Sequence, residues 1–182
     1  MSDIRKFNEQ LLFQAVKTES DELTAEKIVH GNTQQPSSED NALWVKTSMH
    51  RLEKYFDRPT IKRIRMNCQC GQEMDEKLEF IKELLALSSN LEEFANHDRA
   101  RAAGLSFNDG VLYLEFPTCP CPMLAELDKL ETDTWCQCTT GYSKVLFEQA
   151  FGCKVEVELL KSVKMGDDKC LMTIVPCGPV WN

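Results

Sequence analysis

Apolar residues recur every three or four positions through the first hundred residues, which is the spacing of amphipathic helices. Ile4, Phe7, Leu11 and Ala15 predict a helix over 3–17. Ser38 is a suitable N-cap for a later helix, because its hydroxyl can accept from a free backbone N–H. Further helices are predicted over 23–29, over 39–56, from Pro59 to the corner at 68–71, over 73–88, and from Ser89 or Asn90 to about Ala103.

The period of the pattern changes after residue 104. Alternating apolar positions on both sides of the turn 108–110 predict a hairpin, with its second strand at 111–116. One or two helical turns are predicted over 124–130, a helix from about Thr139 to Gly152, and a second hairpin with strands near 155–159 and 170–175. This order predicts an α+β fold with an antiparallel sheet packed by helices. We expect one compact unit, in which a helical region, 1–103, packs on a cysteine-rich α+β core, 104–182.

Charge and hydropathy exclude several classes of function. The net charge is −8 and the pI is about 5.0, so no basic stripe is available for nucleic acid. The most basic run, 62–65, is predicted to be a solvated helix face. No apolar segment reaches 18 residues, and the first residues lack a secretory signal, so we expect no membrane association and a cytoplasmic location.

Nine cysteines stand out in this composition, and six of them form three Cys-x-Cys pairs. In a reducing compartment such cysteines are metal ligands, reactive thiols or small buried residues rather than disulfides. Soft thiolates suit zinc, and four ligands from separate elements close a structural site. An iron–sulfur cluster is the alternative cofactor. The candidate metal ligands are Cys119, Cys121, Cys136, Cys138 and Cys170.

The segment around these cysteines resembles a known domain. Residues 135–143 (WCQCTTGYS), 147–149 (FEQ), 155–163 (VEVELLKSV) and 166–170 (GDDKC) are similar to the 4-vinyl reductase domain superfamily. The similarity is greatest to uncharacterised bacterial members related to aminothiazoline-carboxylate hydrolase. It extends from about residue 105 to 176, and more weakly to the corner at 68–71.

The resemblance implies a fold shared with ligand-binding domains of nitric-oxide signalling and Golgi transport proteins. It also implies a structural zinc ion beside a pocket for an aromatic ligand. Cys136 and Cys170 match the first and last zinc-binding cysteines of the related sensor domains, whereas Ser162 stands where they have a cysteine. Cys119, Cys121 or Cys138 would therefore have to complete the ligand set.

Two functions follow as hypotheses. The first is a zinc-stabilised domain that binds a small apolar or aromatic molecule. The alternative is a metal- or thiol-dependent hydrolase of the aminothiazoline-carboxylate type, with Cys68 or Cys70 as the nucleophile. The helical half could supply a lid or the face of a homodimer. Six aromatic residues could wall the ligand pocket or simply fill the core: Trp44, Phe107, Tyr113, Phe116, Trp135 and Tyr142.

Overall fold

The computed structural model describes residues 3–31, 40–69 and 73–181. Within these residues it contains eight α-helices and one four-stranded antiparallel sheet, which confirms the predicted α+β class. The chain divides into two compact units, each built from two segments. Unit 1 comprises Met1–Cys70 and Pro120–Gly141, and unit 2 comprises Gly71–Cys119 and Tyr142–Asn182. The boundary expected at 103/104 falls inside unit 2.

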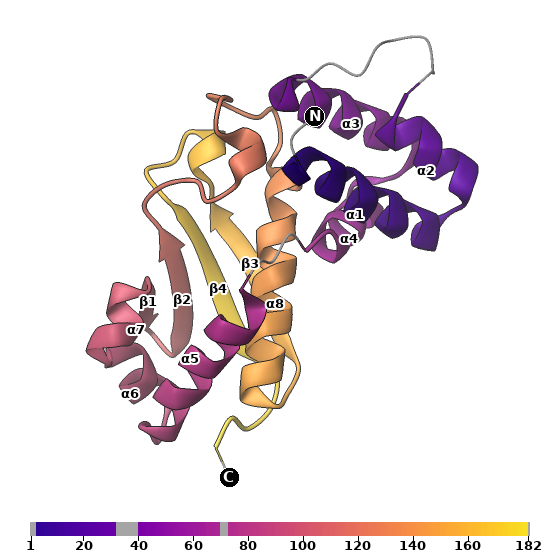
Figure 1. The fold of residues 1–182 in the computed structure, drawn as a ribbon. Coiled ribbons are helices and arrows are strands. Elements are labelled where there is room, and N and C mark those ends of the chain that lie inside the picture. Colours follow the sequence, from indigo (N-terminus) through magenta and orange to yellow (C-terminus); the bar gives the residue numbers. More distant parts are fainter. Residues whose placement is uncertain (1–2, 32–39, 70–72, 182) are drawn as a thin grey trace. The chain divides into compact units, whose positions relative to one another are not determined.

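Unit 1 is helical (Figure 1). Aspartates cap three of its helices: the Asp21, Asp40 and Asp57 carboxylates each accept from the backbone N–H of the third residue of the following helix. The prediction that Ser38 caps the third helix is wrong, because Asp40 does so, and Ser38 lies outside the described residues. The helices are α1 (Asp3–Glu19), α2 (Glu22–Val29), α3 (Asn41–Tyr55) and α4 (Arg58–Asn67), with the 3-10 helices η1 (Pro122–Leu124) and η2 (Asp133–Cys136).

Unit 2 holds the sheet, with strand order β1-β2-β4-β3. Both predicted hairpins are confirmed, and the two are joined by antiparallel pairing of β2 with β4. The strands are β1 (Leu105–Asn108), β2 (Val111–Phe116), β3 (Val155–Lys161) and β4 (Cys170–Pro176), with η3 (Val163–Met165) between the last two. The helices are α5 (Met74–Ala86), α6 (Leu91–Asn96) and α7 (Asp98–Ala102).

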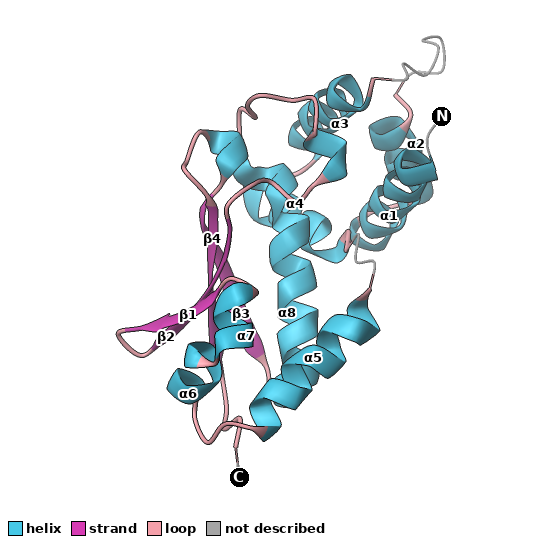
Figure 2. Ribbon diagram, turned by 60° about the vertical axis from the view of Figure 1, so that its left-hand side comes forward, coloured by secondary structure: helices cyan, strands magenta, loops and turns pink. Residues whose placement is uncertain are grey.

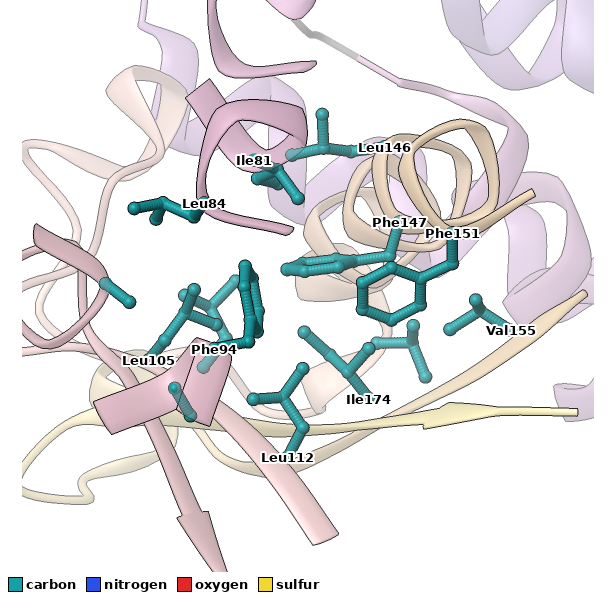
Figure 3. Packing of buried hydrophobic residues seen from close by; sticks show 14 of the residues in the cluster. Ile81, Leu84, Phe94, Leu105, Leu112, Leu146, Phe147, Phe151, Val155 and Ile174 are labelled. Atoms are coloured by element: carbon teal, nitrogen blue, oxygen red, sulfur yellow. The ribbon is translucent and has the colours of Figure 1, made fainter. Parts of the chain in front are cut away.

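The last helix, α8 (Gln137–Phe151), is continuous, although its first turn is assigned to unit 1 and its remainder to unit 2. Its unit 2 portion lies on the same side of the sheet as α5 (Figure 2). An apolar core fills this layer (Figure 3). Phe94 and Phe147 both pack against Phe151, with ring centroids 6.2 and 5.2 Å from the Phe151 centroid, above the inward residues of the strands.

Two predicted helical segments differ from the structure. The helix expected from residue 90 to 103 is split into α6 and α7, because His97 takes an extended conformation and its imidazole Nδ1 accepts from the Arg99 N–H as an N-cap. The helical turns expected over 124–130 are also wrong. Here η1 ends at Leu124 and no helix follows before η2 in this described stretch. None of the described helices is both long and apolar enough to cross a bilayer.

Candidate thiol site in unit 1

The five cysteines that the sequence predicts as metal ligands are distributed over the two units. Cys121, at the start of η1, Cys136, at the end of η2, and Cys138, in the first turn of α8, belong to unit 1. Cys119 and Cys170 belong to unit 2. Of the two candidate nucleophiles, Cys68 is the C-cap of α4 in unit 1, and Cys70 lies outside the described residues.

The first turn of α8 packs directly on the end of α4. A Cβ atom placed on Gly141 would overlap the main-chain carbonyl of Met66, so only glycine permits this approach of the two backbones. Cys68 follows Met66 by two residues, and Cys138 precedes Gly141 by three. This packing brings two buried thiols that are 70 residues apart in sequence close enough for the Cys138 sulfur to raise the pKa of Cys68, and we call them the thiol pair.

The surroundings of Cys68 favour the neutral thiol. It is 1% exposed, and its Sγ–H donates to the Ile64 carbonyl at 3.2 Å. Burial raises the pKa of Cys68 to about 11, and the nearby Cys138 sulfur also raises it, while the Arg65 guanidinium acts in the opposite direction. Roughly one Cys68 side chain in 10,000 is then a thiolate at pH 7. Cys68 would therefore need a cation beside it to act as a nucleophile or as a ligand.

Two arginines and two tryptophans of unit 1 form a continuous buried stack, and one of them, Arg65, lies close enough to Cys68 to lower its pKa. The Arg5 guanidinium is 4.4 Å from the Trp44 ring centroid, and the Arg65 guanidinium is 3.7 Å from that of Trp135. The two indoles meet edge to face, with centroids 5.6 Å apart. All four side chains are at most 4% exposed. We call this group the Arg–Trp stack; the cation–π contacts stabilise charges that burial would otherwise penalise.

Arg65 corrects the prediction that the basic run 62–65 is a solvated helix face. Its guanidinium is 1% exposed, and its Nη2 donates to the Trp135 carbonyl at 3.0 Å. The sequence did contain a signal for this burial. Arg65 lies four residues after Ile61 and three before Cys68, so it shares their buried stripe of α4. The basic composition of the run 62–65 was misleading, because it gives the charge of these residues and not the direction in which each side chain points.

In unit 2, Cys170 is buried and opens β4, where it pairs with Phe116 of β2. Ser162, which stands where the resembling domains have a cysteine, is also buried. Its hydroxyl accepts from the Lys164 N–H at 3.2 Å, and its own N–H donates to Asp167 at 2.8 Å. Ser162 thus caps the η3 turn, which gives this position a structural role that needs no sulfur.

The thiols of unit 1 are donors of the type that soft metals prefer. Among the three described stretches, no group of three or more His, Cys, Asp or Glu side chains is arranged to hold a metal ion. The thiol pair by itself comprises two sulfur donors from separate elements, whereas a structural zinc site needs four ligands. Cys138 also lies at the N-terminus of α8, where the helix dipole favours thiolate charge.

Comparisons with known proteins place the chain in one family. Curated proteins contain no significant match to it, and neither do solved structures. Residues 1–181 match the sequence model of DUF6144, a family of unknown function. Because the match extends over nearly the whole length, the chain belongs to the DUF6144 family.

Proposed function

We propose that this chain binds zinc through buried cysteine thiolates, with Cys68 and Cys138 as two of the ligands. Cys121 and Cys136 are the candidates from unit 1 for the remaining positions. Bound zinc would keep the thiolates deprotonated and would tie the end of α4 to the start of α8. We place this function in the cytoplasm, where thiols stay reduced.

One observation carries the proposal: the contact between Gly141 and Met66. It brings two buried thiols from distant parts of the chain to one place in unit 1. Buried cysteines can also be simple apolar residues. Three features favour a role as metal ligands over a role as apolar core residues. They are the proximity of the two thiols, the glycine that the backbone contact requires, and the adjacent buried guanidinium.

The role of such a site follows from the resemblance noted in the sequence. We propose that the zinc ion is structural and that the chain binds a small apolar or aromatic molecule. Zinc binding can be tested without knowing that molecule, so it comes first. An iron–sulfur cluster would give visible absorption in protein purified without oxygen.

The test is the metal content of protein purified without added metal. We expect about one zinc ion per chain, retained on gel filtration. Cys68→Ser and Cys138→Ser should each lose most of it. Cys177→Ser is the matched control, because Cys177 is exposed and its Sγ contacts the Val175 carbonyl at 3.9 Å.

Two results would overturn the proposal. One is wild-type protein that is folded and has no bound zinc even after incubation with it. The other is zinc content that Cys68→Ser and Cys138→Ser leave unchanged. The same measurement on Cys121→Ser, Cys136→Ser, Cys119→Ser and Cys170→Ser tests the remaining cysteines nominated from the sequence.

A further inference from the structure

We infer that β3 is a docking strand: an extended segment of another protein, with basic residues at every second position, adds to its free edge as a further strand of the sheet. The inference concerns unit 2 and is independent of the proposed zinc site. The strand order places β3 at one end of the sheet, with β4 as its one neighbour among the described strands (Figure 1). Three properties of this edge carry the inference: its backbone groups, its limits and its charge.

The first property is a set of backbone groups that point away from β4. The Cys177 N–H donates to the Lys154 carbonyl at 2.8 Å, so these two residues form a hydrogen-bonded pair just before β3 begins. Hydrogen-bonded and non-bonded pairs alternate in an antiparallel ladder. Val157 and Leu159 therefore occupy non-bonded positions, and their N–H and C=O groups point outward. No hydrogen bond to these groups is found in the described parts of the chain, so they can pair with an added strand.

The second property is that the free part of the edge has defined limits. Val155 also points outward, and its groups are already bonded: its N–H donates to the Glu148 carboxylate at 3.2 Å, and its carbonyl accepts from the Lys144 ammonium. These two α8 side chains form an ion pair and close the start of the edge. At the other end, the ladder with β4 becomes irregular after Leu159. The free edge is therefore 156–160, which suits a short extended segment.

The third property is negative charge on the outer face of β3. Glu156 and Glu158 are exposed, and neither has an ion-pair partner among the described residues. Val157 between them is buried in the core, so the two carboxylates lie on the opposite face of the sheet. Unit 2 contains nine lysine and arginine residues and 15 aspartate and glutamate residues, a net charge of −6. A strand with lysine or arginine at alternate positions places its cations opposite these carboxylates.

The same charge disfavours a second copy of this chain as the occupant. Antiparallel pairing of two β3 edges centred on Val157 places Glu156 opposite Glu158 of the other copy. Pairing centred on Glu158 places two copies of that residue opposite each other. Like charges directly opposite across a strand pair are destabilising, whereas a basic partner turns the repulsion into attraction.

The experiment uses the full chain and two synthetic peptides of equal composition. One peptide alternates lysine and valine, and the other groups its lysines and its valines into separate blocks. We expect saturable binding of the alternating peptide, with a Kd below about 1 mM by fluorescence anisotropy, and no saturable binding of the blocked peptide. Hydrogen exchange followed by NMR should become slower at the Val157 and Leu159 amides when the alternating peptide binds.

The Phe107 amide is the control within the same sheet. The Glu115 N–H donates to the Gly104 carbonyl at 2.9 Å, so the alternation along β1 directs Phe107 outward at the opposite edge. The flanking Ser106 and Asn108 are exposed and carry no charge. Exchange at Phe107 should therefore not change when the peptide binds.

A pair of double variants tests the charge. Glu156→Gln with Glu158→Gln should weaken binding of the alternating peptide by about 2- to 30-fold, because two cross-strand charge pairs are lost. Both side chains are exposed, so the variant should fold like the wild type by circular dichroism. Glu76→Gln with Glu92→Gln is the matched control, since it removes the same charge from exposed positions on α5 and α6. Its binding should change by less than about 2-fold, because salt screens distant charges.

Four results would overturn the inference, and none of them depends on metal. Absence of saturable binding would show that Glu156 and Glu158 only protect the edge from pairing. Equal binding of the two peptides, or equal losses in the two double variants, would indicate nonspecific attraction between charges. Slower exchange at Phe107 and not at Val157 would place the added strand on β1. Dimers of the chain alone, with slow exchange at Val157 and Leu159, would identify a second copy as the occupant.

Discussion

The two units bury different kinds of side chain. The core of unit 2 is apolar throughout, and its α5–α8 layer meets the sheet through leucine, isoleucine, valine and phenylalanine (Figure 3). The interior of unit 1 also contains leucine and isoleucine, yet it buries two arginines, a thiol pair and a glycine contact that admits no other residue. Burial of apolar side chains stabilises the fold and requires no particular partner. Burial of a charge costs desolvation free energy, so a buried charge needs a compensating partner.

The difference indicates a division of labour. Unit 2 is built as a conventional hydrophobic core, and nothing in that core needs an ion or a ligand to become favourable. Unit 1 contains charged groups whose burial becomes favourable only with partners: Arg5 with Trp44 and Glu9, and Arg65 with Trp135. We therefore expect core substitutions in unit 2 to change stability alone, and substitutions at the thiol pair or at Gly141 in unit 1 to change stability and metal binding together.

The largest effect is expected at Phe147 in unit 2. It is 1% exposed and packs on Phe151, so Phe147→Ala should lower the free energy of unfolding by about 3–5 kcal/mol. Denaturant unfolding followed by circular dichroism measures this. Leu87→Ala is the control, because Leu87 is 68% exposed, and it should change stability by less than about 0.5 kcal/mol. A comparable loss in the two variants would contradict the assignment of Phe147 to the core.

The next effect tests the backbone contact in unit 1. Gly141→Ala should cost about 3 kcal/mol, because its new methyl group overlaps the Met66 carbonyl and the two backbones must separate. It should also reduce zinc content. Gly110→Ala is the control: a Cβ there meets nothing within 4 Å, and only the positive φ of 82° opposes it. Full zinc content in a folded Gly141→Ala protein would show that zinc binding does not depend on this contact.

Removal of metal should lower the stability of unit 1 specifically. Trp44 and Trp135 report on unit 1, and Trp181→Phe removes the indole of unit 2. In that variant, a chelator should lower the unfolding free energy seen by fluorescence by about 2.7 kcal/mol, relative to protein with free zinc at 100 times its Kd. Adding the Cys68→Ser substitution should abolish the chelator effect. A chelator effect that survives it would place the bound metal elsewhere.

The smallest effect concerns helix caps and pH. Hydrogen bonds from Thr24 and Thr60 lower the pKa values of the Asp21 and Asp57 carboxyls. A lowered pKa means that each carboxylate stabilises the folded state above its unfolded pKa of about 3.9, and that this contribution disappears as pH falls through the folded value. Unit 2 uses Asn90 for the same purpose in α6, and an amide does not titrate in this range.

Asp21→Asn with Asp57→Asn should therefore reduce the loss of unit 1 stability between pH 5 and pH 3. The measurement is denaturant unfolding by fluorescence at both pH values in the Trp181→Phe background. Asn90→Asp in unit 2 is the reciprocal change, and it should leave the fluorescence-detected slope of unit 1 unaffected. An identical pH slope in the double variant and its parent would show that these caps contribute nothing measurable.

Local patterns in the sequence predicted most of the elements. Alternation on either side of 108–110 was sufficient for the first hairpin, because a two-residue period and turn residues are local signals. The break at His97 was not predictable from periodicity, since it depends on an imidazole that replaces a backbone partner. Long-range contacts were the main omission. Nothing near Gly141 in sequence indicates Met66, and nothing near Arg65 indicates Trp135, because each pair meets only in the folded chain.

The discontinuity of unit 1 has a consequence for how the protein is made. Residues 71–119 separate its first segment from its second, and a ribosome adds roughly 5–20 residues per second. The four N-terminal helices therefore emerge several seconds before η2 brings Trp135 to Trp44. During that interval the Trp44 indole and the Arg65 guanidinium lack their partner Trp135, and we expect the nascent chain to be a substrate for chaperones. Nascent chains stalled before residue 120 should accordingly be more sensitive to protease than chains stalled long enough after residue 141 for it to have left the ribosome.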